Sequence, residues 1–241
     1  MKPILVVLII TGSFAAPPLH KLKIIGGDDA AEGEFPYQAS IKIFRAHSCG
    51  GSIISTKSIL TAAHCYNPFV PMEVVVGTIK MFDEGDSYEV QKLTPHPEFN
   101  METIENDVAV INLVKEIVLN DKIQPIALNT ADVVAGSSCT LTGWGLTSYP
   151  GSPFTDLQKI NLLTISNDVC RKMHESVGIQ IYDSQVCTLT KVGEGACGPT
   201  LVDLLFKMEN RLEFILGEYR AVLDNLTFTQ MYRLLSAGLI V

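Results

Sequence analysis

Two short segments carry side chains of the types that transfer protons in enzymes. His64 stands beside Cys65 at the end of Leu60-Thr61-Ala62-Ala63-His64-Cys65, and Asp107 opens an apolar run. Imidazole and carboxylate groups are the usual proton carriers of enzymes. Taken singly, each residue also has an ordinary structural explanation, as a packed histidine or a strand-end aspartate. The sequence has no Cys-x-x-Cys pair and no two histidines at a metal-binding spacing, so we expect no metal site.

The order of the motifs along the chain is more informative than any one of them. The motifs are Lys23-Ile24-Ile25-Gly26-Gly27, Cys49-Gly50-Gly51-Ser52-Ile53-Ile54, the His64 segment, Asn106-Asp107-Val108-Ala109-Val110 and Gly143-Trp144-Gly145. In this order they resemble the chymotrypsin/trypsin family of secreted serine endopeptidases. The resemblance runs from Lys23 to about Val202, and the His and Asp motifs together are highly specific.

The resemblance implies acyl transfer from a peptide bond. His64 would be the general base that takes a proton from a serine, and Asp107 would hold the imidazole in the right tautomer. Cleavage after Lys23 by an activating protease would free the Ile24 amine. The implied partners are therefore a peptide or protein substrate and that protease, and no cofactor is implied.

The chain departs from the family after Gly193-Glu194-Gly195-Ala196-Cys197. The family continues with one residue and then Gly-Asp-Ser-Gly-Gly-Pro, whereas Cys197 here runs directly into Gly198-Pro199-Thr200. The same gap removes the backbone N–H groups of the oxyanion hole and the aspartate that receives the Ile24 amine. No Gly-x-Ser-x-Gly occurs elsewhere. We therefore expect a catalytically inactive chain.

Two further sets of site residues follow from the resemblance. The substrate pocket would have Gly195 and Ala196 at its base, without a carboxylate to pair with a cationic side chain. Disulfides are expected for Cys49 with Cys65 and for Cys170 with Cys187. Cys139 and Cys197 lose the partners that the family supplies, and the sequence does not choose between a bond to each other, two thiols and a bond between chains.

The elements that must position these residues are short strands. Between Pro36 and Ile165, β-branched runs are cut by Gly, Pro, Asn and Asp, as in residues 39–44, 72–76, 108–111 and 157–162. Only residues 61–64 and 166–174 interrupt them with helical turns. We expect an all-β, chymotrypsin-like double β-barrel with an incomplete second barrel.

The last segment changes its period. Apolar residues recur at helical spacings, namely Leu201, Leu204, Leu205, Met208, Leu212, Ile215, Leu216 and Tyr219. The pattern predicts an unrelated helical tail over residues 203–241. Its Asn225-Leu226-Thr227 is the single glycosylation sequon of the chain, with Asn225 as the acceptor.

Composition and the first residues indicate the compartment and exclude several partners. The 241 residues carry a net charge of −8 with no block of Lys or Arg, so we expect no nucleic-acid partner. Lys2 and the apolar residues 4–10 precede the small residues 12–16, which is typical of a signal peptide cut after Ala15 and too short for a membrane span. We expect a secreted, extracellular protein that does not bind membranes, with six cysteines that favour disulfides over metal ligands.

The predicted organisation is a signal peptide (1–15), an activation propeptide (16–23), a protease-like domain (24–202) and the tail (203–241). The predicted function is that of a secreted serine-endopeptidase homologue without activity. Two origins fit the abrupt change after residue 202: a non-catalytic binding or regulatory homologue, or a truncated product of an active digestive protease gene, which we favour. A lectin-like β-protein is a distant alternative, because it leaves the order of the motifs unexplained.

Overall fold

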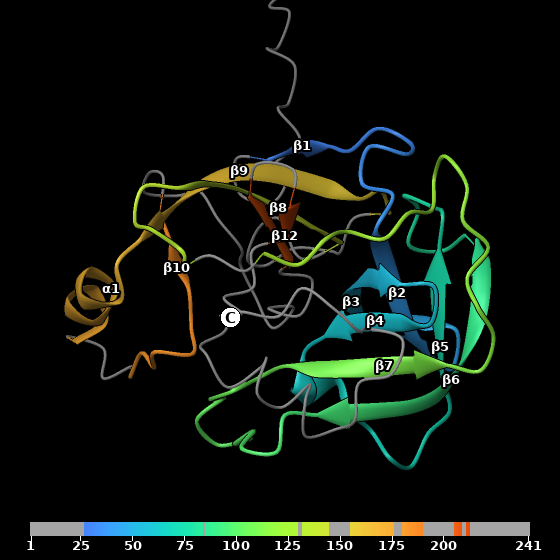
Figure 1. Cartoon of the computed structure of the whole chain (residues 1–241), viewed down its shortest axis with the longest axis horizontal. Coiled ribbons are helices and arrows are strands. Elements are labelled where there is room, and N and C mark those ends of the chain that lie inside the picture. Colours follow the sequence, from blue (N-terminus) through green and yellow to red (C-terminus); the bar gives the residue numbers. More distant parts are fainter. Residues whose placement is uncertain are drawn as a thin grey trace, which may run out of the picture.

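A closed barrel of six antiparallel strands forms the first half of the molecule. The computed structural model describes residues 27–83, 85–129, 132–144, 155–175, 180–189, 205–208 and 211–212. The barrel has the strand order β2-β3-β4-β7-β6-β5 and lies at the right of Figure 1. Its strands are β2 (Gln38–Ile43), β3 (Ala46–Ser55), β4 (Ser58–Thr61), β5 (Met72–Val76), β6 (Asp86–Pro95) and β7 (Ala109–Leu113). The β-branched runs predicted from the sequence are confirmed as strands.

Inward-facing aliphatic side chains fill this barrel. Ile41, Ile53, Ile59, Val74 and Ile111 have no exposed surface. Gly51 of β3 lies where a side chain would not fit, because an added Cβ would come within 2.7 Å of Ile59 Cγ2 and 3.0 Å of the Leu60 carbonyl oxygen. The absence of a side chain at Gly51 therefore lets β3 pack closely against Ile59 and Leu60 of β4.

The second half is an open sheet in the described residues. Its order is β1-β9-β8-β11-β12, and β10 also pairs with β9. The strands are β1 (Asp28–Asp29), β8 (Ser138–Gly143), β9 (Gln158–Ile165), β10 (Cys187–Thr188), β11 (Leu205–Met208) and β12 (Arg211–Leu212). Burial alternates along β9, as expected for a sheet with one covered face. The all-β architecture with one closed barrel and a second half built on strands is confirmed.

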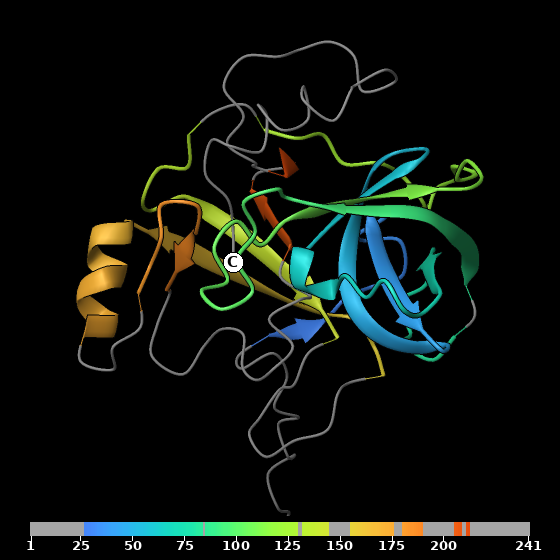
Figure 2. The same cartoon turned by 90° about the horizontal axis from the view of Figure 1, so that it is seen from below.

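Two short helices complete the described part of the chain. The 3₁₀ turn η1 covers Ala63–Cys65, and α1 covers Asn167–His174. The hydroxyl of Ser166 accepts a hydrogen bond from the Val169 N–H at 3.3 Å and caps α1. Both lie where the sequence predicted helical turns, and Figure 2 shows α1 at the far end of the second half from the barrel.

The structure corrects part of the prediction for the tail. Residues 205–208 and 211–212 are strands, whereas the apolar spacing predicted a helix there. The backbone of β11 pairs antiparallel with β8, from Leu205 opposite Thr142 to Met208 opposite Cys139. The free edge of β8 supplies a full row of backbone partners, and this long-range pairing outweighs the local preference for a helix. The remainder of residues 203–241 lies outside the described residues.

Candidate active site

His64 and Asp107 lie at one edge of the first barrel because two paired strands end there. Thr61, the last residue of β4, pairs with Ala109, the first residue of β7. The chain leaves β4 into η1, which carries His64, and it enters β7 two residues after Asp107. The Thr61 hydroxyl also donates to the Gly50 carbonyl oxygen at 2.8 Å and ties the end of β4 to β3. Residues separated by 43 positions thus meet at a fixed place on the barrel rim.

The carboxylate of Asp107 contacts His64 twice. Oδ1 accepts a hydrogen bond from the His64 backbone N–H at 2.8 Å, and Oδ2 lies 2.5 Å from Nδ1 of the ring. The Asp107 side chain is 5% exposed and that of His64 is 25% exposed. A carboxylate acceptor makes Nδ1 the protonated nitrogen, so Nε2 carries the lone pair. The geometry prepares Nε2 to accept a proton.

A strained turn holds the backbone just before Asp107. Ile104 and Asn106 both have φ of 56°, in the left-handed region that asparagine tolerates but a β-branched residue such as Ile104 seldom adopts. Hydrogen bonds secure the turn, since the Ile104 N–H donates to the Asn100 carbonyl oxygen at 2.7 Å and the Asn106 side-chain amide donates to the Glu98 carbonyl oxygen at 3.1 Å. These bonds offset the strain and fix the point at which the chain enters β7.

The Gly143-Trp144 motif joins the second sheet to the first barrel. Trp144 is 1% exposed, and its indole N–H donates to the Ile79 carbonyl oxygen at 2.8 Å. Its ring packs edge-on against His47 with 5.2 Å between centroids. Nδ1 of His47 is in turn 2.8 Å from the Ser40 hydroxyl of β2. The tryptophan is therefore a buried link between the two halves.

Both expected disulfides are present. Cys49 of β3 is bonded to Cys65 of η1, and Cys170 of α1 is bonded to Cys187 of β10. Cys139 is 1% exposed, and its sulfur lies 3.5 Å from the Leu162 carbonyl oxygen. The remaining predicted site residues lie outside the described residues, namely Lys23, Ile24, Gly195, Ala196, Cys197 and Asn225.

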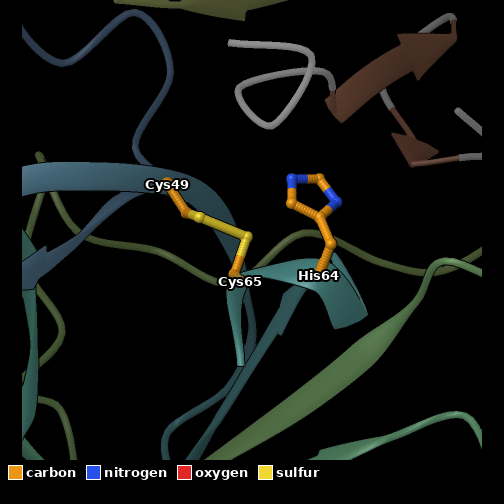
Figure 3. A group of neighbouring side chains, drawn as sticks. All are labelled: Cys49, His64 and Cys65. Atoms are coloured by element: carbon orange, nitrogen blue, oxygen red, sulfur yellow. A yellow bond between two sulfur atoms is a disulfide. The ribbon is translucent and has the colours of Figure 1, made fainter. Parts of the chain in front are cut away.

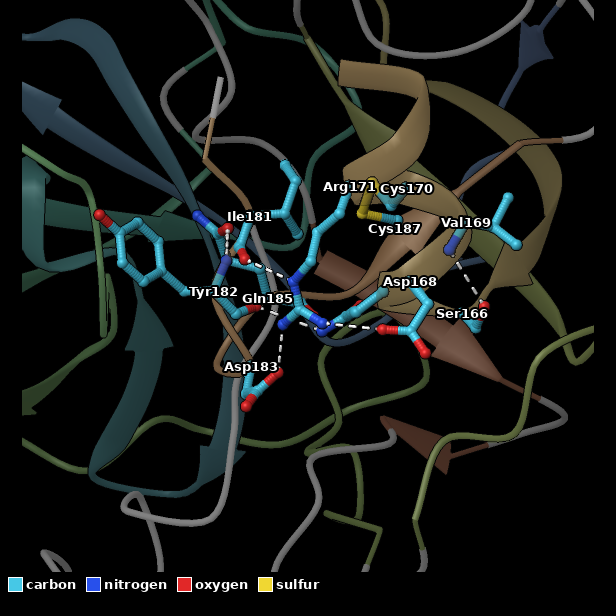
Figure 4. Close-up of polar contacts among 11 residues, drawn as sticks. Ser166, Asp168, Val169, Cys170, Arg171, Ile181, Tyr182, Asp183, Gln185 and Cys187 are labelled. Carbon is cyan, nitrogen blue, oxygen red and sulfur yellow. Dashed lines mark hydrogen bonds and ion pairs between the residues drawn. A yellow bond between two sulfur atoms is a disulfide. The ribbon is translucent and has the colours of Figure 1, made fainter. Parts of the chain in front are cut away.

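A polar cleft of about 450 Å³ next to the turn before β7 was not predicted. It is lined by residues from the turn before β7 and from the segment between α1 and β10, including Glu98, Glu105, Asn106, Arg171, Tyr182 and Asp183. Arg171 bonds to Asp183, to Asp168 at 3.1 Å and to the Ile181 carbonyl oxygen at 3.0 Å (Figure 4). The hydrogen bond with Asp183 and the nearby carboxylates raise the pKa of Arg171. The sequence signal for this cluster was the Asp168/Arg171 pair, three residues apart on a predicted helix.

No helix in the described residues has both the length and the apolar character that a membrane span requires.

Comparisons with known proteins agree with this geometry. The family model described as Trypsin matches residues 24–198. Chymotrypsin-2 of Vespa crabro is 36% identical over 177 residues, which cover 72% of this chain and 78% of that protein. Trypsin alpha-4 of Lucilia cuprina is 33% identical, covering 73% of this chain and 69% of that protein. Serine protease SP24D of Anopheles gambiae is also 33% identical, with 80% and 72% covered. With its barrel, its His64–Asp107 pair and both expected disulfides in place, this chain belongs to the chymotrypsin/trypsin family of serine proteases.

Proposed function

We propose that this chain is a secreted serine-protease homologue that does not cleave peptide bonds. The observation that carries the proposal is a contrast between two parts of the chain. His64 and Asp107 are assembled at 2.5 Å, whereas Cys197 is followed at once by Gly198-Pro199-Thr200. The family resemblance requires Gly-Asp-Ser-Gly in that place, so the base lacks the hydroxyl that it would deprotonate.

The expected loss of rate is large because two contributions are missing together. Removal of a triad serine costs about 10⁶-fold in kcat, and the residual rate of about 10³ to 10⁴ over water comes from the oxyanion hole and from substrate binding. The segment that is missing here also supplies the oxyanion-hole N–H groups. Little of that residual rate should therefore remain.

The test is hydrolysis of peptide amides together with labelling by a serine-directed phosphonylating reagent. The full chain, after cleavage at Lys23, should show neither, while an active trypsin-family enzyme treated in parallel shows both. His64→Ala serves as the matched variant, because any amide hydrolysis that survives this substitution comes from a contaminant. Stoichiometric labelling of one serine, lost in His64→Ala, would contradict the proposal.

Export and processing form the second part of the proposal. Residues 1–15 would be removed as a signal peptide, and residues 16–23 would be removed by cleavage before Ile24. Support comes from the leader-like residues 2–16 and from Lys23 before an apolar Ile-Ile-Gly-Gly. Mass spectrometry of the medium of expressing eukaryotic cells should find chains that begin at residue 16, and a glycosidase-sensitive mass at Asn225. Retention of the intact leader inside the cells would overturn this part.

A further inference from the structure

The Cys49–Cys65 disulfide and His64 form a group of three metal-ligating side chains. One ligand atom of each residue lies within 4.8 Å of the others. Cys49 and Cys65 are 3% and 5% exposed, whereas a quarter of the His64 side-chain surface is open to solvent. Figure 3 shows the imidazole beside the disulfide, with one ring nitrogen on the side of the sulfurs and the other on the far side. The spacing of the three residues along the chain did not predict this group, because Cys49 comes from a strand 16 residues before Cys65.

The surroundings match those of metal-ligating residues. A histidine that binds a metal usually donates its other N–H to a carboxylate, which fixes the ring and raises its basicity. Asp107 does this at Nδ1 and leaves Nε2 with a lone pair. Two sulfurs and one imidazole nitrogen are a donor set that favours zinc.

We propose that the thiol form of this chain binds one zinc ion through Cys49 Sγ, Cys65 Sγ and His64 Nε2, with a water molecule as the fourth ligand. The thiol form exists before the disulfide is made, and it returns when a dithiol reductant of the thioredoxin class supplies two electrons and two protons to break the S–S bond. Zinc then displaces the two thiol protons to water, and two Zn–S bonds form. Metal binding and disulfide formation thus compete for the same two sulfurs.

The required rearrangement is small. Zn–S distances of about 2.3 Å and a Zn–N distance of about 2.0 Å in a tetrahedral site separate the sulfurs by about 3.8 Å and each sulfur from the nitrogen by about 3.6 Å. The Cα atoms of Cys49 and Cys65 are already 6.3 Å apart. The sulfurs separate once the covalent bond is broken, and the ring must then close a remaining gap of up to about 1.2 Å. The solvent-exposed edge of His64 provides the entry path.

The test must distinguish this site from the second disulfide. Cys170 Sγ lies 3.9 Å from Nδ1 of His174, so reduction also creates a cysteine–histidine pair there. His174→Gln is therefore the matched control for His64→Gln, since each removes one imidazole beside one former disulfide. Asp107→Asn is a third variant, because it leaves all three ligands in place and removes the carboxylate behind the ring. It also destabilises the fold, so its zinc affinity is compared under conditions where its circular dichroism matches that of the reduced wild type.

The experiment uses the full chain reduced with a phosphine under anaerobic conditions and titrated with Co²⁺, followed by displacement with Zn²⁺. We expect intense visible absorption of a tetrahedral cobalt–thiolate site at one equivalent, which is absent in the oxidised chain. Wild type and His174→Gln should have the same zinc affinity. His64→Gln should bind at least 10-fold more weakly, and Asp107→Asn should lose 10- to 100-fold.

Any of four results would overturn the proposal, and three of them come from the titrations of the wild type and the two histidine variants. The reduced chain could fail to bind either metal, it could bind with equal affinity after His64→Gln, or it could lose the site in His174→Gln instead. A chain that unfolds on reduction and binds zinc through disordered thiols is recognised by the same comparison. Such binding would not respond to Asp107→Asn, and that outcome also counts against a formed site.

Discussion

Asp107 binds His64 through both of its carboxylate oxygens, one to the backbone N–H at 2.8 Å and one to Nδ1 at 2.5 Å. The first bond secures η1, and the second orients the ring. A carboxylate that is 5% exposed and accepts two hydrogen bonds contributes to folding as well as to chemistry. The pair is therefore expected to remain assembled whether or not a nucleophile stands beside it.

Asp107→Asn should lower the free energy of unfolding. An asparagine offers one oxygen where the structure needs two acceptors, so one N–H of His64 would face an N–H₂ group. We expect a loss of about 1.5 to 3 kcal/mol, the range for hydrogen bonds to a charged group. Urea unfolding measures it, with the exposed Asp121→Asn as a control that should change stability by less than about 0.5 kcal/mol. Equal stabilities for the two variants would show that the pair contributes nothing to the fold.

Burial of His96 should make the protein less stable in mild acid. The side chain is 2% exposed, and burial lowers its pKa from 6.5, although the charge of Glu98 acts in the opposite direction. As the pH falls below 6.5, the unfolded chain takes up a proton that the folded chain still refuses. Above pH 6.5 this contribution to the free energy of unfolding is fully present. It is lost as the pH drops from 6.5 to the lowered pKa of the folded state, and no further loss from this group occurs below that pKa.

The variant that isolates this effect is His96→Asn. Nδ1 of His96 accepts a hydrogen bond from the Glu98 N–H at 3.2 Å, and the asparagine oxygen can replace it without titrating. The slope of unfolding free energy against pH between 5 and 6.5 should decrease by up to about 1.4 kcal/mol per pH unit. Whatever the variant costs at neutral pH, an unchanged slope would assign the acid sensitivity to other groups.

The hairpin between β2 and β3 should accept a stabilising double substitution. Ile43 pairs with Ala46, so Phe44 and Arg45 form a two-residue turn, with φ of 51° and 65°. Such a turn favours Asn-Gly, and each side chain in the left-handed region costs about 1 to 2 kcal/mol. Phe44 is 76% exposed and loses little burial. Phe44→Asn with Arg45→Gly should therefore stabilise the protein by about 1 to 2 kcal/mol.

The control for this prediction is Phe69→Asn. Phe69 is 91% exposed, and its φ does not lie in the left-handed region. Loss of an exposed phenyl ring alone should leave the melting temperature nearly unchanged. If both variants raise it equally, the gain comes from removing surface aromatics and not from the turn.

Much of the first barrel could be predicted from the sequence because its strands are local patterns. The apolar run from Val108 to Ile111 predicted the strand that the structure has as β7 (Ala109–Leu113), and the 166–174 segment predicted α1. The strand at Leu205–Met208 could not be predicted in this way. Its pairing with β8 depends on a free sheet edge more than 60 residues earlier in the chain, and a local period carries no information about such an edge.

The same limit applies to the site. Motif order indicated His64 and Asp107, and the structure brings them together. The proximity of Cys49 to the imidazole follows from the turn of η1 against β3, so only the fold shows it. The cleft between the turn before β7 and the segment after α1 likewise joins residues separated by about 80 positions, as in the 3.4 Å hydrogen bond from the Asn106 N–H to the Ser184 hydroxyl.

The last prediction concerns the specificity of an active counterpart. In the family, the residue two positions before the cysteine that precedes the serine segment selects the substrate side chain, and this chain has Gly195 there. A buried Lys or Arg head would find no carboxylate, whereas an aromatic or large aliphatic side chain gains by leaving water. A chimera with Gly-Asp-Ser-Gly and a complete second barrel restored should therefore cut after Phe, Tyr, Trp or Leu.

Gly195→Asp in the same chimera is the matched variant and should shift the preference toward Lys and Arg. The measurement is kcat/KM for both chimeras on substrates that differ only in the side chain before the cleaved bond. Faster cleavage after Arg than after Phe in the chimera with Gly195 would refute the assignment of the pocket.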